Sequence, residues 1–248
     1  MKKIISSIAV ATLFCLTLSA QGNQGNFEFG ENADFSIRKG IFSAETVSYV
    51  AFGDHNLLNA DSDFETNKGK ALTEFFMNIV ELRVHPYETG MFTLGVDFDW
   101  DYYRLRNTYF WQPDASKEKV SIASMEGSGL KRIKRSRLSV RTLSVPLAFE
   151  QRFDKFTLRL GAAAEYNFPA ISRFKGESKD GATVKEWKNG EHFSKQIKTN
   201  PFTYNVFGAL SYGGIGVYVK YCPVTQFEAG YGPQFKSISF GIISGLGM

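Results

Sequence analysis

Apolar and polar residues alternate with a period of two along most of the chain beyond residue 42. In 92–102, for example, every even position is Phe, Leu, Val, Trp or Tyr, and every odd position is Thr, Gly or Asp. Such alternation predicts β-strands, because successive side chains of a strand point to opposite faces. Eight strands are predicted: 45–52, 72–86, 92–102, 136–153, 156–167, 202–212, 214–221 and 237–248.

One predicted strand changes its phase. In 136–153 the apolar residues Leu138 and Val140 occupy even positions, whereas Leu143, Val145 and Leu147 occupy odd ones. An extra residue shifts the alternation by one, so the slip predicts a β-bulge. On that interpretation, the apolar residues before and after the bulge share one face of the strand.

The predicted connections alternate between short and long. Three are tight turns: 87–89, 154–155 and 213–214. Four are longer: 53–71, 105–135, 170–200 and 222–235. Outer-membrane barrels combine short periplasmic turns with long external loops. The pattern therefore predicts an all-β fold, an eight-stranded antiparallel up-and-down transmembrane β-barrel with short periplasmic turns and long external loops.

The face opposite the apolar one decides between a membrane barrel and a soluble one. It carries small residues such as Gly161, Ala163, Gly216, Ser239 and Gly241, which suit the inside of a narrow barrel. Aromatic residues also lie near both ends of the apolar face, as in the two interfacial belts of membrane barrels. On the long-loop side they are Trp100, Tyr102, Tyr166, Phe168, Phe202 and Tyr221, and on the tight-turn side Tyr87, Phe92, Phe153, Phe156 and Tyr212. A transmembrane barrel is favoured, with a soluble lipocalin-like ligand-binding barrel as an alternative.

The N-terminus predicts export. Lys2 and Lys3 precede an apolar stretch, 4–18, and the small residues Ser19-Ala20, as in a secretory signal peptide. We therefore predict a cleaved signal peptide at 1–20, an N-terminal segment at 21–42 and an outer-membrane barrel domain at 43–248. Without Lys2 and Lys3, 27 basic residues face 25 acidic ones, which gives no reason to expect a nucleic-acid partner. The single remaining cysteine excludes a disulfide scaffold.

Several strand segments resemble the PorT-like outer-membrane β-barrel proteins of the Bacteroidetes type. They are Glu81-Leu82-Arg83-Val84-His85-Pro86-Tyr87, Leu94-Gly95-Val96-Asp97-Phe98-Asp99-Trp100, Leu143-Ser144-Val145-Pro146-Leu147 and Gly216-Val217-Tyr218-Val219-Lys220-Tyr221. The resemblance covers about 45–248. It implies an outer-membrane barrel of roughly eight strands, with a role in protein secretion for some members of the family and no catalytic signature.

The predicted inward face carries charges of both signs. The acids are Glu81, Asp97, Asp99, Asp101, Glu150 and Glu165, and the bases are Arg83, Arg137, Arg141, Arg152, Arg159 and Lys220. Charges in a narrow interior are costly unless they are paired. The balance of six against six predicts a salt-bridge network that closes the lumen, so that the barrel conducts no ions.

Catalytic and metal sites are not predicted. Asp97, Asp99 and Asp101 could offer oxygen ligands to Ca²⁺, but alternate strand residues are nearly 7 Å apart, which favours pairing with arginines instead. A barrel enzyme acting on lipid A or phospholipid would need a Ser–His pair. Of the three histidines, His55 and His192 lie in predicted loops with Ser62 or Ser194 as potential partners, and His85 lies beside a tight turn. Nothing in the sequence fixes such a pair, so we predict a non-enzymatic protein without cofactor and keep the enzyme as an alternative.

The densest basic run precedes and enters the fourth predicted strand from its external end. Lys131, Arg132, Lys134 and Arg135 could reach the phosphates of lipopolysaccharide there through charge-assisted hydrogen bonds, although a solvated loop face would have the same composition. The predicted partners are therefore outer-membrane lipid and lipopolysaccharide and, from the resemblance, secretion or surface-assembly proteins.

Overall fold

The computed structural model describes residues 42–46, 48–58, 73–105, 108–114, 119–179, 183–184 and 197–246. Residues 1–41, Ser62, His192 and Ser194, for which predictions were made, lie outside these ranges. The described strands are β1 (Phe42–Thr46), β2 (Val50–Leu58), β3 (Glu74–Tyr87), β4 (Gly90–Arg104), β5 (Tyr109–Asp114), β6 (Lys119–Ser124), β7 (Leu130–Phe153), β8 (Phe156–Asn167), β9 (Ile171–Ser178), β10 (Thr183–Val184), β11 (Phe202–Tyr212), β12 (Ile215–Cys222) and β13 (Lys236–Ser244). Within the described ranges there is no helix of the length and hydropathy needed to cross a membrane.

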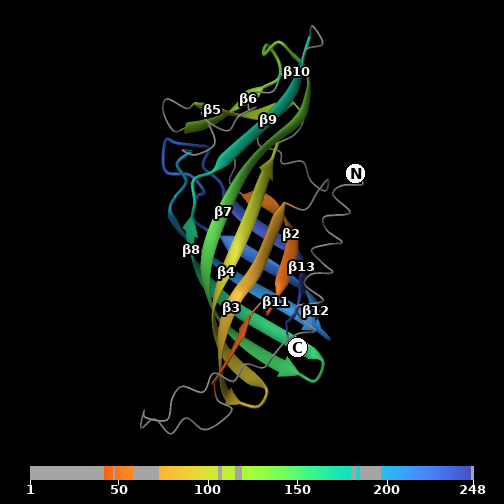
Figure 1. The fold of residues 1–248 in the computed structure, drawn as a ribbon, viewed down its shortest axis with the longest axis vertical. Helices are drawn as coiled ribbons and strands as arrows, with labels where there is room; N and C mark the ends of the chain where they lie inside the picture. Colours follow the sequence, from red (N-terminus) through yellow and green to blue (C-terminus); the bar gives the residue numbers. More distant parts are fainter. Residues whose placement is uncertain are drawn as a thin grey trace.

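Eight of these strands form a closed antiparallel ring. β2 pairs with β3, then β4, β7, β8, β11, β12 and β13 follow in order, and β13 pairs back onto β2. Figure 1 shows these strands wrapped around a common interior. β1 pairs with the second half of β3, while β2 pairs with its first half. The predicted eight-stranded antiparallel barrel is therefore confirmed.

The three predicted tight turns are also confirmed. They join β3 to β4, β7 to β8 and β11 to β12, and they lie at one end of the barrel (Figure 1). Gly213 and Gly214 have φ values of 56° and 86°, as both central residues of a type I′ hairpin require. We call the end of the barrel that carries these three turns the turn end, and the opposite end the loop end.

The apolar faces of the strands form the outer wall of the barrel. Exposed residues there include Leu82, Leu94, Leu147, Leu160, Val206, Leu210, Val217, Phe240 and Ile242. The aromatic residues Trp100, Tyr166, Phe168 and Phe202 are exposed toward the loop end, and Tyr87, Phe92, Phe153, Phe156 and Tyr212 toward the turn end. The polar and small residues consequently face the lumen, as the alternation predicts.

Two predicted loops contain strands, so that part of the prediction is wrong. β5, β6 and the start of β7 lie in 105–135, and β9 and β10 lie in 170–200. β7 has 24 residues, about twice the nine to eleven that a tilted strand needs to cross a membrane. Its first part pairs with β9 beyond the ring, beside the β5–β6 hairpin (Figure 1). Phe110, Ile133 and Phe174 bury one another between these strands, which explains why the segment is ordered as a sheet extension.

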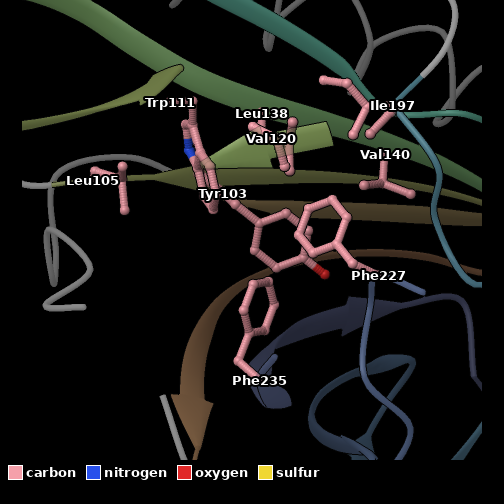
Figure 2. Packing of buried hydrophobic residues seen from close by; sticks show 10 residues of the cluster. Tyr103, Leu105, Trp111, Val120, Leu138, Val140, Ile197, Phe227 and Phe235 are labelled. Carbon is pink, nitrogen blue, oxygen red and sulfur yellow. The ribbon is translucent and has the colours of Figure 1, made fainter. Parts of the chain in front are cut away.

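The loop end of the lumen is covered by a cluster that we call the apolar cap. Its buried members are Tyr103, Leu105, Trp111, Val120, Leu138, Val140, Ala170, Ile197, Phe227 and Phe235. Figure 2 shows side chains of β4, β5, β6 and β7 meeting Phe227 and Phe235, which both lie in the connection between β12 and β13. Trp111 donates from Nε1 to the carbonyl oxygen of Tyr103 at 2.9 Å, so the cap also satisfies its indole N–H.

The predicted bulge in 136–153 is wrong. Leu138 and Val140 point inward to the apolar cap, whereas Leu143 and Val145 point outward, so two apolar groups lie on opposite faces of one regular strand. A register irregularity is instead found in β3, between Asn78 and Val80 against β4. It places Glu74, Phe76 and Asn78 inward before the irregularity, and Glu81 and Arg83 inward after it.

Candidate functional site

The lumen holds two clusters of charged residues, one nearer each end of the barrel. Nearer the turn end, Arg159 Nη2 lies 2.6 Å from Glu81 Oε2, and Arg159 Nη1 lies 3.4 Å from Glu150 Oε2. Arg83 Nε lies 2.9 Å from Glu81 Oε1. The Arg159 guanidinium also stacks 4.7 Å from the ring centre of Tyr49. We call Glu81, Arg83, Glu150 and Arg159 the turn-side network. One buried guanidinium thus links two carboxylates from different strands.

Asp97 is held by neutral groups rather than by a cation. Tyr49 donates its hydroxyl to Asp97 Oδ2 at 2.5 Å, and Asn78 Nδ2 donates to Oδ1 at 2.8 Å. Glu165 is likewise held by neutral donors: Thr203 and Asn205 donate to its two oxygens at 2.6 and 2.5 Å. Neutral donors can satisfy a buried carboxylate, although they do not balance its charge.

Nearer the loop end, Lys220 is the central cation. Its ammonium lies 3.2 Å from Asp99 Oδ2 and forms a closer ion pair with Glu74. Tyr218 donates its hydroxyl to the other oxygen of Glu74 at 2.5 Å. A side chain at Gly53 would collide with this Tyr218 hydroxyl and with the backbone oxygen of Phe240, so glycine is required there. We call Glu74, Asp99, Tyr218 and Lys220 the loop-side network.

The predicted balance of six acids and six bases is wrong. The buried acids are Glu74, Glu81, Asp97, Asp99, Asp101, Glu150 and Glu165, whereas the buried Arg and Lys residues among those described are Arg83, Arg159 and Lys220. Arg152 is half-buried and lies 3.7 Å from Glu150. Arg137 and Arg141 face outward, because β7 keeps a regular register with β4 from Arg137 onward. Neutral donors such as Tyr49, Asn78 and Tyr218 hold part of the excess acid.

His55 lies in β2 and not in a loop, and it contacts two buried polar groups. Its Nδ1 lies 2.9 Å from Ser239 Oγ, and its Nε2 lies 3.1 Å from Asp101 Oδ1. The ring stacks on Tyr103 of the apolar cap at 5.1 Å. The order Ser–His–Asp is that of a hydrolase triad, but with the two ring nitrogens exchanged, and Ser239 is only 1% exposed. A nucleophile in this position has no access to a substrate.

His55, Glu74 and Asp101 could also offer one ligand atom each to a metal ion, within 4.8 Å of one another. Each of them is already engaged by the protein: Glu74 by Lys220 and Tyr218, Asp101 by His55, and His55 by Ser239. The ammonium of Lys220 would moreover repel a cation bound to Glu74. The arrangement is therefore complete as a hydrogen-bonded cluster, and Asp97, Asp99 and Asp101 point to separate partners.

The basic run lies on the sheet extension. Lys131, Arg132, Lys134 and Arg135 are exposed on β7, beyond the ring of eight strands. Lys134 forms an ion pair with Glu177 of β9 at 2.8 Å, and the hydrogen bond from Lys134 lowers the pKa of Glu177. Arg135 is opposite Lys175 in the register of β7 with β9. One of the four predicted residues, Lys134, is thus paired with a carboxylate of the protein itself.

Comparison with known proteins gives distant structural likenesses to solved structures and no sequence match. No family model and no curated protein sequence matches the chain. Two solved structures of Ail, the attachment invasion locus protein of Yersinia pestis, are similar at 11% identity, covering 82% of this chain and 96% of theirs. The TM-score is 0.32 for Ail in complex with the heparin analogue sucrose octasulfate and 0.28 for Ail without it. The fold assignment therefore rests on the strand pairing of this chain itself, and nothing about function follows from the likeness.

Proposed function

We propose that this protein is an integral outer-membrane β-barrel with a closed lumen, which acts as a non-enzymatic structural or surface-accessory protein. The observation that carries the proposal is the contrast between the two faces of the ring. Its outer wall is apolar between two sets of aromatic residues, whereas its inner wall is polar and buried. A soluble barrel needs the opposite arrangement, with its apolar side chains inside.

The closed lumen is supported by the packing of its contents. Eight strands leave an interior that side chains can fill. Arg159 and Lys220 bridge carboxylates across this interior, and the apolar cap covers its loop end. Purified protein in planar bilayers should show no stable open channel. Reproducible nanosiemens-scale steps would contradict the closed lumen without contradicting the barrel.

Membrane insertion has its own test. The full chain should stay with the membranes after high-salt washing and dissolve only in detergent, and it should migrate differently in unheated and boiled gel samples. Release of most of the protein with the soluble fraction would overturn the membrane proposal.

A lipid hydrolase is the second candidate, because Ser239, His55 and Asp101 lie in hydrogen-bond sequence. Ser239 is buried, and its partner His55 stacks on Tyr103 of the apolar cap, which favours a structural role for the three residues. A fluorophosphonate probe should therefore leave the folded protein unlabelled. Labelling that is lost in Ser239→Ala, together with loss of fatty-acid release from phospholipid or lipid A, would establish the enzyme instead.

A further inference from the structure

We propose that the outer face of β4, β7 and β9 binds the phosphate groups of lipid A through Arg104, Arg137 and Arg173. This inference rests on the proposed function, because it requires that face to lie at a membrane surface. It assigns the phosphate contact to residues outside the basic run 131–135.

The three arginines stand in one row across three strands. Arg104 of β4 is directly opposite Arg137 of β7, and Arg137 is directly opposite Arg173 of β9. Directly opposed residues place their Cβ atoms about 4.5–5.5 Å apart, and like charges in such positions destabilise a sheet. We call this row the arginine ladder. A bound anion would offset the repulsion that its members exert on one another.

The ladder faces away from the lumen. The residues that alternate with it along the strands, such as Leu138, Ser172 and Phe174, are buried on the inner side. The Arg137 guanidinium lies 4.8 Å above the ring of Tyr102, and Tyr102 stacks on the exposed Trp100 at 5.6 Å. Arginine and aromatic residues therefore share one continuous outer face.

The position of these aromatic residues sets the level of the ladder relative to a membrane. Trp and Tyr of membrane barrels lie at the interface between hydrocarbon and headgroups. Arg104 follows Tyr102 by two residues, or about 7 Å along the strand, on the side away from the turn end. That distance places the guanidinium groups at the depth of lipid headgroups, where their planar forks can bind phosphate oxygens in pairs.

The described part of the protein does not neutralise the ladder itself. None of its carboxylates forms an ion pair with Arg104, Arg137 or Arg173. Farther from the barrel, in contrast, Lys134 of the basic run is paired with Glu177. Charge that has no partner within the described fold is available to a lipid, and this separates the ladder from the run.

The test compares two triple variants of the full chain that remove equal charge. Arg104→Gln, Arg137→Gln and Arg173→Gln together should weaken binding of bis-phosphorylated lipid A to the protein in neutral detergent micelles by about tenfold or more at low salt. Lys131→Gln, Arg132→Gln and Lys134→Gln together should weaken it by less than about threefold. Raising the salt concentration should reduce the difference, because the contact is ionic.

Binding measurements with other ligands test whether the phosphate groups of lipid A are what the ladder recognises. Lipid A without its phosphates should bind to the wild type as weakly as phosphorylated lipid A binds to the ladder variant, and inorganic phosphate should compete only weakly. Equal binding of phosphorylated and dephosphorylated lipid A, tighter binding of phosphatidylglycerol, or equal loss in the two triple variants would overturn the proposal. Unheated gel migration of each variant shows whether the barrel is folded. If the wild-type chain forms no membrane barrel, the proposed function is wrong. If the ladder variant folds and binds lipid A like the wild type, only this inference is wrong.

Discussion

The positive charge of Arg159, buried in the lumen, is compensated within the protein, whereas the arginines on the outer face have no acidic partner among the described residues. Arg159 is 1% exposed, and it has two carboxylates within ion-pair distance and an aromatic ring beneath it. Arg137 is half-buried beside Arg104 and Arg173, and its described aromatic contact is Tyr102. A buried charge must be compensated within the fold, whereas a surface charge can be left to solvent or to a ligand. The difference separates groups that hold the barrel together from groups available for binding.

The largest expected effect on stability is that of a substitution in the turn-side network of the lumen. Arg159→Ala leaves Glu81 and Glu150 without their shared partner, and removing one member of a buried ion pair costs about 3–5 kcal/mol of stability. We expect this loss in the urea midpoint of unfolding, followed by the fraction of folded protein in unheated gels. Arg152→Ala, at the half-exposed edge of the same network, is the matched control and should cost less than about 1 kcal/mol. Similar losses in the two variants would show that water reaches the turn-side network.

The apolar cap should give the next effect. Leu138→Ala would leave a cavity beneath Trp111 and Tyr103, at a cost of about 2–5 kcal/mol. Leu143→Ala, on the outer face of the same strand, is its control, because detergent or lipid tails can fill the space and no cavity remains. Equal losses for Leu138 and Leu143 would indicate that both residues face outward, as the bulge prediction requires.

The neutral donors of the lumen should contribute less than its cations, but measurably. Tyr49→Phe removes the hydroxyl that donates to Asp97, and an unsatisfied buried polar group costs about 1–3 kcal/mol. Tyr212→Phe, at an exposed position near the turn end, should leave the stability unchanged. Wild-type stability in Tyr49→Phe would mean that Asn78 alone satisfies the carboxylate.

The alternation of apolar and polar residues, together with the alternation of short and long connections, was sufficient to predict the barrel and most of its inward acids, since Asp97, Asp99 and Asp101 lie on one regular strand. It failed where an apolar residue has two possible environments. Leu138 in the apolar cap and Leu143 on the outer wall have the same side chain, so the sequence does not distinguish a change of environment from a bulge. The real irregularity in β3 had a signal, because Glu74 and Asn78 share the parity of Phe76, whereas Glu81 and Arg83 have the other parity.

Partners across the barrel could not be predicted in the same way. Glu74 meets Lys220, and Arg159 meets Glu81, only because the ring closes with a particular register. The balance of six acids and six bases counted formal charges and ignored neutral donors, although Tyr49, Asn205 and Thr203 hold two of the acids. Uncharged donors such as Thr and Asn are also common on protein surfaces, so the sequence alone does not identify them as partners of a buried carboxylate.

The smallest expected effect on stability is that of a substitution in the arginine ladder on the outer face. Arg137→Gln removes the middle charge of the arginine ladder, which relieves repulsion worth about 0.2–1 kcal/mol between directly opposed like charges. It also loses the contact between the guanidinium and Tyr102, worth about 0.5–1 kcal/mol at an exposed site. Because the two terms oppose each other, unfolding in neutral detergent should stay within about 0.5 kcal/mol of the wild type. With lipid A present the balance changes, because the wild type gains stability from a bound ligand and the variant gains less. The measurement is the difference between the urea midpoints of the wild type and Arg137→Gln, taken with and without lipid A. A large loss of stability in neutral detergent alone would mean that Arg137 stabilises the fold as Arg159 does. The contrast between the inner and outer arginines would then be wrong.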